Sequence, residues 1–396
     1  INAGANAIYL SGKNYGARKY ANNFTKEEIA DMITYAHLRH VLVFVTVNTL
    51  VFEEELEELI IYTDYLVKHH VDALIVQDLG LIEYFVNRYP DTEIHASTQM
   101  NTYNSNQLSY LKGLGVSRVI LARETSIDQI KVMKEAIDID LEVFVHGALC
   151  VSYSGNCLFS SMNGGRSGNR GECAQPCRLA YRLFRNKSLI EPESYLLSTK
   201  DLMTIDHLKE IALSGVKSFK IEGRMRRPEY VVATVRAYRE ALDHMMDESH
   251  EFDLERRIRE LLLSYNRDFT KGYLLNELPS DINQSFRPNH LGITIGKVLN
   301  FERGKTTIIL SDTLSKGDGI RIPGVKDIGG EVGRILKNDM QVETADAGDT
   351  IVIDLASAVL PGSIVMKTLD KALDSSLSPY FSETYKLMDL DGTLKV

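Results

Sequence analysis

Four cysteines are the only ones in the 396 residues, and all of them lie in one short window. They are Cys150, Cys157, Cys173 and Cys177. Thiolates grouped this closely either bind a soft metal centre or form disulfides. The sequence has no apolar signal segment with positive flanks, and no run of about 18 apolar residues that would span a bilayer. We therefore expect a cytoplasmic protein, with no membrane partner, whose thiols stay reduced and form a four-cysteine metal site.

The spacing of the cysteines bears on the kind of metal centre. Cys173 and Cys177 are separated by three residues, as in a zinc knuckle, whereas Cys150 and Cys157 are separated by six. Structural zinc sites usually use two tight cysteine pairs. Iron–sulfur clusters tolerate wider and irregular spacing, because the cluster is larger than one ion. The spacing favours an iron–sulfur cluster, with zinc as the alternative.

Charge is unevenly distributed along the chain. The composition, with 44% hydrophobic and 25% charged residues, is ordinary, and the net charge of −9 argues against a generally basic nucleic-acid-binding protein. However, residues 166–187 contain six basic side chains against Glu172, and residues 217–227 contain five against Glu222. Each segment is either a solvated basic face or a site for an anion or a phosphate backbone.

The elements that must position the cysteines alternate between strands and helices. Short β-branched or apolar runs are separated by amphipathic stretches such as 25–40, which opens with a Thr25–Glu28 capping box, and 53–69. The predicted strands are 7–10, 41–47, 73–76, 93–96, 119–121, 141–145 and 218–221. This pattern predicts an α/β fold with a parallel sheet, of the TIM-barrel type. Residues 1–4 resemble the end of a helix, so we expect a first strand and helix to precede them.

Polar residues follow the predicted strands at their carboxyl ends, where barrel enzymes carry their chemistry. They are Asn48, Gln77, Asp78, Gln99, Arg123, Glu124, His146, Glu222 and Arg224. The segment that contains the four cysteines, 150–177 (the cysteine segment), follows one predicted strand directly, after 145–147. We therefore expect the metal centre to lie over the mouth of the barrel. The predicted domains are a (β/α)-barrel at 1–280 with a Cys-rich insertion at 147–200, a small β-barrel at 281–370, and a tail or incomplete hairpin at 371–396.

Several blocks of the sequence resemble peptidase family U32. They are EVFVHGALCVSYSGNC at 142–157, NRGECAQPCR at 169–178, HASTQ at 95–99, STKDL at 198–202, FKIEGR at 219–224 and NRDFTKG at 266–272. The resemblance covers nearly the whole chain. It implies a tRNA hydroxylase that makes 5-hydroxyuridine at the wobble position, takes the hydroxyl from prephenate, and holds a 4Fe–4S cluster through the four cysteines. It also allows a paralogue of the family as partner subunit.

The residue types agree with this implication. A dicarboxylate such as prephenate needs cationic forks, which Arg123, Arg224 and Arg226 can supply, and a tRNA needs a basic approach surface, which 166–187 supplies. The predicted catalytic residues are His146, Arg123 and Glu222. The predicted substrate-binding residues are His95, Gln99, Arg123, Arg170, Arg224 and Arg226.

Two alternatives remain open at this stage. A peptidase would use Ser154 or Cys150 as nucleophile with His146 as base. The sequence has neither an HExxH zinc motif nor a Gly-x-Ser-x-Gly elbow, and a cysteine committed to a metal cannot attack a carbonyl. The other alternative is a zinc-stabilised RNA-binding protein without catalytic activity.

Overall fold

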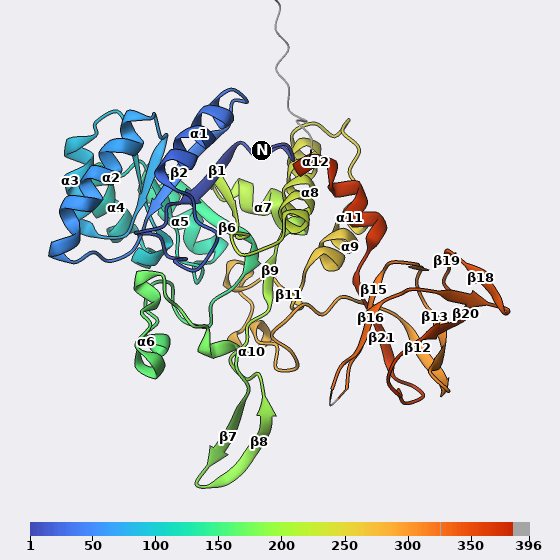
Figure 1. Cartoon of the computed structure of the whole chain (residues 1–396). Helices are drawn as coiled ribbons and strands as arrows, with labels where there is room; N and C mark the ends of the chain where they lie inside the picture. Colours follow the sequence, from blue (N-terminus) through green and yellow to red (C-terminus); the bar gives the residue numbers. More distant parts are fainter. Residues whose placement is uncertain (325, 383–396) are drawn as a thin grey trace, which may run out of the picture.

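The computed structural model describes residues 1–324 and 326–382. An α/β part contains the amino-terminal two thirds of the chain, a narrow two-stranded arm projects from it, and an antiparallel domain follows (Figure 1). In the described residues no helix is both long enough and apolar enough to cross a membrane.

Seven parallel strands build the core of the α/β part. They are β1 (Ala7–Ser11), β2 (Leu42–Val47), β3 (Ala73–Val76), β4 (Glu93–Ala96), β5 (Arg118–Ile120), β6 (Asp140–Ala148) and β10 (Ser218–Ile221). Each of the first five pairs with the next along the chain, and β10 pairs with β6. The sequence predicted a strand at each of these positions, and for β3, β4 and β10 the predicted ends are confirmed, because short apolar runs between turn residues mark them sharply.

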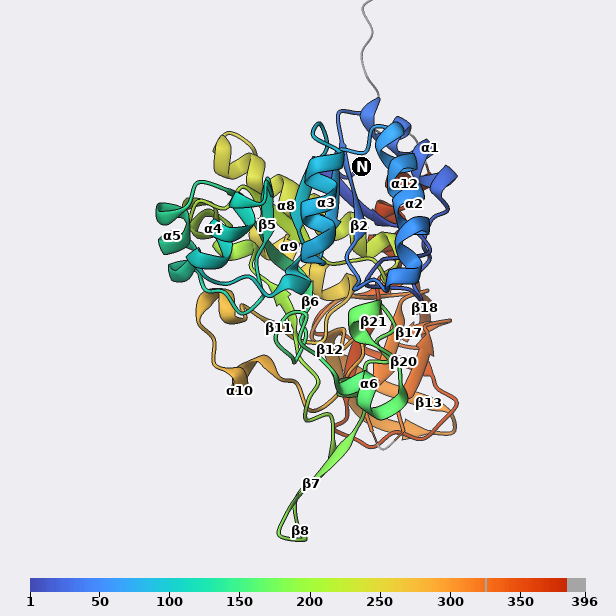
Figure 2. The same cartoon turned by 90° about the vertical axis from the view of Figure 1, so that its left-hand side faces the viewer.

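Helices cover the outer face of this sheet (Figures 1 and 2). They are α1 (Lys26–His37), α2 (Leu56–Lys68), α3 (Leu79–Arg88), α4 (Ser105–Gly113), α5 (Ile127–Ala136), α7 (Leu208–Leu213), α8 (Pro228–Met246) and α9 (Leu254–Ser264). The predicted capping box is confirmed at Thr25 and Glu28. α1 buries Ile29, Ile33 and Ala36, whose spacing places them on one helical face against the strands.

The sheet is curved, so that its inner face has its own apolar cluster, which includes Phe44, Ile75 and Phe144. Tyr9 on β1 lies 4.4 Å, ring centroid to Nζ, from Lys220 on β10, so the first and last parallel strands approach each other through side chains. Among the described residues, no backbone pairing joins these two strands. The mixed α/β fold with a parallel sheet is therefore confirmed, whereas a TIM-type barrel, with a further first strand, stays a prediction.

The Cys-rich insertion leaves from the end of β6. It contains α6 (Phe159–Gly164), the 3₁₀ turns η3 (Gly168–Arg170) and η4 (Pro176–Arg178), and the hairpin β7 (Tyr181–Arg185) and β8 (Ser188–Ser194). β9 (Asp201–Met203) then returns antiparallel to the end of β6, and β11 (Phe269–Thr270) pairs parallel to β9. The remaining short helices of this part are η1 (Glu53–Glu55), η2 (Thr98–Met100), η5 (Ile205–His207), η6 (Tyr273–Leu275) and α10 (Pro279–Ile282).

The carboxyl-terminal domain is an antiparallel half-barrel with its own core, which includes Ile308, Ile351 and Val365. Its strands are β12 (Ile293–Glu302), β13 (Lys305–Leu310), β14 (Leu314–Ser315), β15 (Gly319–Ile322), β16 (Ile328–Glu331), β17 (Ile335–Lys337), β18 (Met340–Val342), β19 (Thr344–Ala345), β20 (Thr350–Asp354) and β21 (Ile364–Leu369). The main sheet has the order β16-β15-β21-β12-β13-β20-β17-β18. The predicted small β-barrel is thus observed as a half-barrel.

The predicted tail is wrong over its first part. Residues 371–382 form α11 (Lys371–Leu377) and α12 (Pro379–Ser382), where the sequence suggested a tail or incomplete hairpin. Leu377 is fully buried in a small cluster with Val232 and Ala233 of α8, and this burial stabilises α11 against the α/β part. The Asp-Gly pair at 391–392 lies outside the described residues.

Candidate metal centre and anion site

The four cysteines lie in loops and 3₁₀ turns beyond the end of β6. All four thiols are free; Cys150 is exposed and the other three are partly buried. Burial raises the pKa of Cys177, the charge of Arg178 lowers it, and the other three cysteines each raise it further. In the described residues, however, no group of three or more His, Cys, Asp or Glu side chains is arranged to hold a metal ion. The fold gathers the thiols in one region without setting them around a single ion.

Two glycines allow the cysteine segment to dock against the strand-end loops. Gly155, with φ at +75°, lies so close to the chain that a Cβ would be 1.8 Å from the carbonyl oxygen of Gln99. At Gly171, with φ at +78°, a Cβ would be 2.3 Å from the carbonyl oxygen of Gly16. Both positions therefore require glycine. The predicted substrate residue Gln99 meets the cysteine segment here through its backbone.

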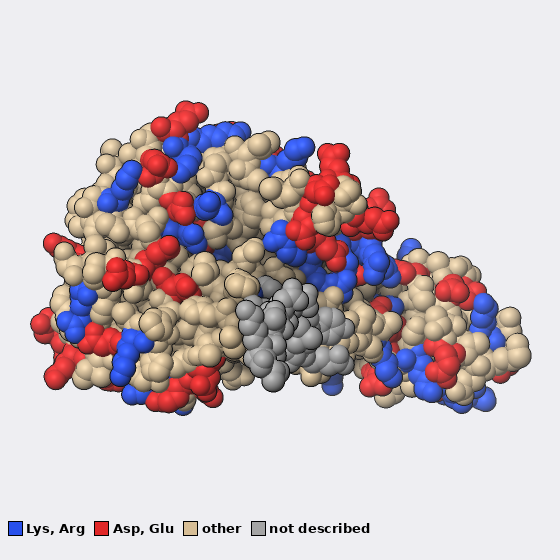
Figure 3. All heavy atoms as spheres, turned by 90° about the horizontal axis from the view of Figure 1, so that it is seen from above, with Lys and Arg blue, Asp and Glu red and all other residues tan. Residues whose placement is uncertain are grey.

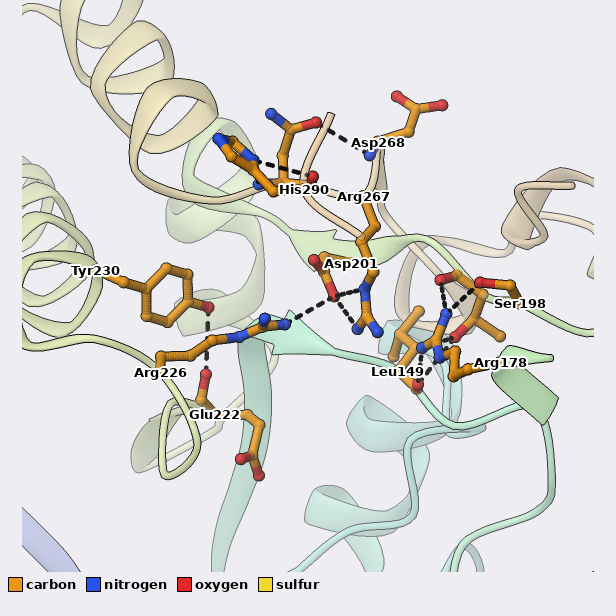
Figure 4. Close-up of polar contacts among 12 residues, drawn as sticks. Leu149, Arg178, Ser198, Asp201, Glu222, Arg226, Tyr230, Arg267, Asp268 and His290 are labelled. Atoms are coloured by element: carbon orange, nitrogen blue, oxygen red, sulfur yellow. Dashed lines mark hydrogen bonds and ion pairs between the residues drawn. The ribbon is translucent and has the colours of Figure 1, made fainter. Parts of the chain in front are cut away.

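Arg178 fastens both ends of the cysteine segment to the α/β part (Figure 4). Its guanidinium donates hydrogen bonds to Ser198 Oγ (2.7 Å), Thr199 Oγ1 (2.8 Å) and the carbonyl oxygen of Thr199. It also donates to the carbonyl oxygen of Leu149 (3.1 Å), the residue before Cys150. Since Arg178 itself follows Cys177, one side chain joins the first and last cysteines of the segment.

The charges of three arginines act on the buried carboxylate of Glu222, which follows the last parallel strand. Burial alone would raise the pKa of Glu222, but the charges of Arg18, Arg123 and Arg224 together hold it below its usual value. Among the described residues, none of these three guanidiniums forms a salt bridge with a carboxylate. Three positive charges against one negative charge leave the cluster with an excess of two, which suits a ligand with two negative charges.

The arginine cluster borders the cysteine segment. The pKa of Arg18 is raised chiefly by Glu222, in spite of burial, and Tyr9, Cys173 and Cys150 raise it further. Tyr9 also donates a long hydrogen bond, 3.5 Å, to Glu222 Oε2. A ligand held by these arginines would therefore lie next to whatever group the thiols bind.

The other two arginines of the cluster contact β6 and the loop before α1. The Arg123 guanidinium lies 4.1 Å above the Phe144 ring, and its buried Nε has no hydrogen-bond partner in the described structure. Arg224 donates to Asn23 Oδ1 at 2.7 Å. Arg123, Glu222 and Arg224, three of the predicted site residues, thus belong to one charged cluster, and their roles stay predictions.

Sequence reasoning missed Arg18 and Tyr9. Tyr9 lies on β1, and Arg18 lies in the loop after it. Lys13, Arg18 and Lys19 follow a predicted strand end, as the other rim residues do, and this position could have identified Arg18.

Arg226 lies apart from this cluster, although only one residue separates it from Arg224. Its guanidinium stacks on the Tyr265 ring at 3.5 Å. It also pairs with Asp201 at 3.7 Å (Figure 4). Asp201 also forms a buried ion pair with Arg267. Removing one partner of such a buried network is costly, so Arg226 contributes to the structure beneath the cysteine segment rather than to the arginine cluster.

Arg170 also lies outside the arginine cluster. It donates to both carboxylate oxygens of Glu55, at 2.9 and 2.6 Å, and to the carbonyl oxygen of Leu50 at 2.8 Å. A cavity of about 160 Å³ lies beside it, lined also by Lys13, Tyr15 and Glu58. Arg170 therefore holds the insertion against the end of η1 and the loop that precedes this turn.

His95 and His146 are both buried. His95 bonds through Nε2 to Glu93 Oε2 at 2.7 Å and packs against Phe44 inside the curved sheet. His146 is only 1% exposed, and the rings of Tyr230, Tyr238 and Phe269 surround it. In the described residues, neither imidazole forms a hydrogen bond with an arginine of the cluster or with Glu222.

Acidification is expected to destabilise the protein through His146. Burial lowers the pKa of His146 to about 3, whereas an unfolded histidine has a pKa of about 6.5. Between these values the unfolded chain binds a proton that the folded protein excludes. The free energy of unfolding should therefore fall by about 1.4 kcal/mol per pH unit below the unfolded pKa, from this residue alone.

Urea unfolding at neutral and mildly acidic pH measures this slope. His146→Leu should flatten it, whereas the exposed His250→Gln should leave it unchanged. An unaltered slope in His146→Leu would show that another group causes the acid sensitivity.

The sequence was compared with known families and proteins. The model of "Peptidase family U32" matches residues 1–284. The "23S rRNA 5-hydroxycytidine C2501 synthase" of Escherichia coli is 36% identical over 326 residues, covering 81% of this chain and 49% of that protein. The "tRNA hydroxylation protein P1" of Bacillus subtilis is 33% identical, covering 82% of this chain and 80% of that protein. A "Collagenase" of Porphyromonas gingivalis is 35% identical over 70% of each chain. The chain thus spans about half the length of the E. coli relative.

Proposed function

Because the chain belongs to peptidase family U32, we propose that it is an RNA-modifying enzyme that hydroxylates a pyrimidine base. In the specific form of the proposal, it converts the wobble uridine of tRNA to 5-hydroxyuridine, with prephenate as the source of the hydroxyl and a 4Fe–4S cluster as cofactor. Two of the relatives compared above are named for hydroxylation of RNA, one of tRNA and one of rRNA. An anticodon loop is single-stranded, so its bases can be splayed into a site at the rim of the sheet.

The observation that carries the proposal is the arginine cluster beside the cysteines. Arg18, Arg123 and Arg224 around Glu222 leave an excess of two positive charges, and prephenate has two carboxylates. Guanidinium groups form paired hydrogen bonds with carboxylates, so these three side chains would bind and orient the co-substrate. Tyr9, which already donates to Glu222, offers a hydroxyl at the same place.

The cysteine segment fits a sulfur-ligated cofactor by its donor chemistry. Four free thiols lie in one insertion, which contacts the loop of Arg18 through Lys19 and Gly171. Arg178, which follows Cys177, donates to the carbonyl oxygen of the residue before Cys150. Cys150, Cys157, Cys173 and Cys177 would hold the cluster. When bound, such a cluster supplies one-electron transfer. The positive charge of Arg18 would stabilise the thiolates that ligation requires.

A peptidase is less well supported, although one relative is named a collagenase. Its predicted base, His146, is buried among aromatic rings. Its predicted nucleophile Ser154 is also buried, and its hydroxyl oxygen accepts a hydrogen bond of 3.2 Å from the backbone N–H of Arg123. Cys150, the other predicted nucleophile, is free and exposed. In the described residues, neither nucleophile forms a hydrogen bond with His146, so no nucleophile–base pair is formed at these positions.

Mass spectrometry of nucleosides tests the proposal. Cells that lack this protein should lose a hydroxylated pyrimidine from tRNA, and the wild-type gene should restore it. Purified protein prepared without air should produce the same nucleoside when supplied with prephenate and the unmodified tRNA. Loss of a modification from rRNA instead would overturn the choice of tRNA, and an unchanged nucleoside profile in both RNA pools would overturn the proposal as a whole.

A further inference from the structure

The six basic residues between positions 166 and 187 fall into two groups in the structure. Three of them make contacts within the protein. Arg166 donates to the carbonyl oxygen of Glu172 and lies over the Tyr20 ring, Arg170 pairs with Glu55, and Arg178 fastens the cysteine segment. The other three, Arg182, Arg185 and Lys187, lie on the hairpin β7–β8 or its turn. The free positive charge of this segment is therefore on the hairpin.

The hairpin is a projecting arm with both faces in solvent. β7 and β8 pair only with each other, and all of their residues except Tyr181 and Ser194 are exposed. Figures 1 and 2 show the arm extending away from the body in both views. Asn186 and Lys187 form its turn with φ at +49° and +66°, which is the tight two-residue connection of a hairpin.

The cations at the tip of the arm are available to a partner. In the described part of the chain, neither Arg185 nor Lys187 forms an ion pair, and Arg182 pairs only at the surface, with Glu193 at 3.0 Å. The Phe184 ring is 56% exposed beside them. Two unpaired cations next to an exposed aromatic face are the components with which proteins bind phosphates and stack bases.

The root of the arm is fixed relative to the cysteine segment. Arg178 lies three residues before β7, and Tyr181, the first residue of β7, donates to the carbonyl oxygen of Pro176 at 2.8 Å. The Tyr181 ring also lies 6.3 Å from the Phe159 ring of α6. The arm is therefore anchored to the segment that carries the thiols, on the side of the sheet where the cysteine segment leaves β6 (Figure 1).

We propose that the β7–β8 arm binds the RNA substrate, with Arg185 and Lys187 on phosphates and Phe184 against a base. This inference rests on the proposed function. It identifies the surface that would hold the RNA while one base reaches the carboxyl ends of the parallel strands. The apolar residues of the arm do not form one docking face, because Phe184 pairs with Leu189 while Leu183 is opposite Glu191. On the opposite side of the molecule, acidic and basic side chains are intermixed (Figure 3).

The test compares two hairpin tips of similar composition. Arg185→Ala/Lys187→Ala removes the two unpaired cations at the tip of the arm. Arg303→Ala/Lys305→Ala removes two cations at the β12–β13 turn of the half-barrel, where Arg303 is highly exposed. Binding of a fluorescent tRNA anticodon stem–loop is measured by anisotropy over a range of salt concentrations. The arm variant should bind roughly tenfold more weakly. Its plot of log K against log salt concentration should be less steep by about 1.4, because two phosphate contacts on a single strand are lost. The half-barrel variant should behave as wild type.

Further measurements separate this inference from the proposed function. The arm variant should keep its metal content, its prephenate binding and its unfolding midpoint. If wild-type protein hydroxylates RNA while the arm variant binds RNA with unchanged affinity and slope, the assignment of the arm is wrong and the proposed function stands. If Phe184→Ala converts a dimer to a monomer in size-exclusion chromatography without weakening RNA binding, the arm binds a second copy of the chain, and the inference is also overturned. A wild-type protein that neither binds nor modifies RNA would refute the proposed function and this inference together.

Discussion

Replacing any one of Cys150, Cys157, Cys173 and Cys177 with alanine is expected to remove the metal centre and abolish RNA hydroxylation. The chain has no other cysteine, so no thiol can substitute for the one that is lost. A cluster held by the remaining three would expose one iron site to solvent. Protein purified without air should be brown in the wild type and pale in each variant, and iron and sulfide analyses should fall in parallel with hydroxylation.

The matched control for this prediction is Asn156→Ala. Asn156 is exposed and precedes Cys157, so its replacement changes the same loop without removing a thiol. It should retain the colour and the iron. Full iron content and full hydroxylation in Cys173→Ala would show that the four cysteines do not act as one ligand set, and zinc with no colour in the wild type would favour the zinc alternative.

Arg18→Ala and Arg224→Ala should each weaken prephenate binding roughly thirtyfold, which corresponds to about 2 kcal/mol for one charge-assisted contact. Either change reduces the excess charge around Glu222 from two to one. Binding to the RNA stem–loop should change much less, because these side chains lie at the rim rather than on the arm. Since the chain has no tryptophan, isothermal titration calorimetry is the suitable measurement.

Arg227→Ala is the matched control for the arginine cluster. Arg227 is close to Arg224 in sequence but exposed, where it pairs with Glu229 and Asp374. It should bind prephenate as the wild type does. If Arg224→Ala weakened prephenate and RNA binding equally, Arg224 would not belong to a carboxylate site, and the arginine cluster would instead contact the polynucleotide.

The elements that the sequence predicted well are those whose buried residues follow one clear spacing along the chain. β3, with four consecutive buried residues, and α1, with its capping box, carry their own start and stop signals. The arm at 181–194 and the helix at 371–377 were missed for opposite reasons. The arm buries almost nothing, so no alternation of apolar residues marks its strands. α11 is short and depends on the contact of Leu377 with α8, which its own sequence cannot reveal.

The sequence by itself determined that this chain has an α/β part, a strand-rich carboxyl-terminal domain and one concentrated group of thiols, because these depend on residue types and local spacing. Only the tertiary structure decided which charged side chains meet. Arg18, Arg123 and Arg224 are about a hundred residues apart, and the curved sheet brings them together because β1, β5 and β10 run parallel and end at one edge. Arg224 and Arg226 are near neighbours in sequence, yet one lies at that edge and the other pairs with a buried aspartate. Spacing along the chain does not fix the direction of a side chain in a loop; packing does.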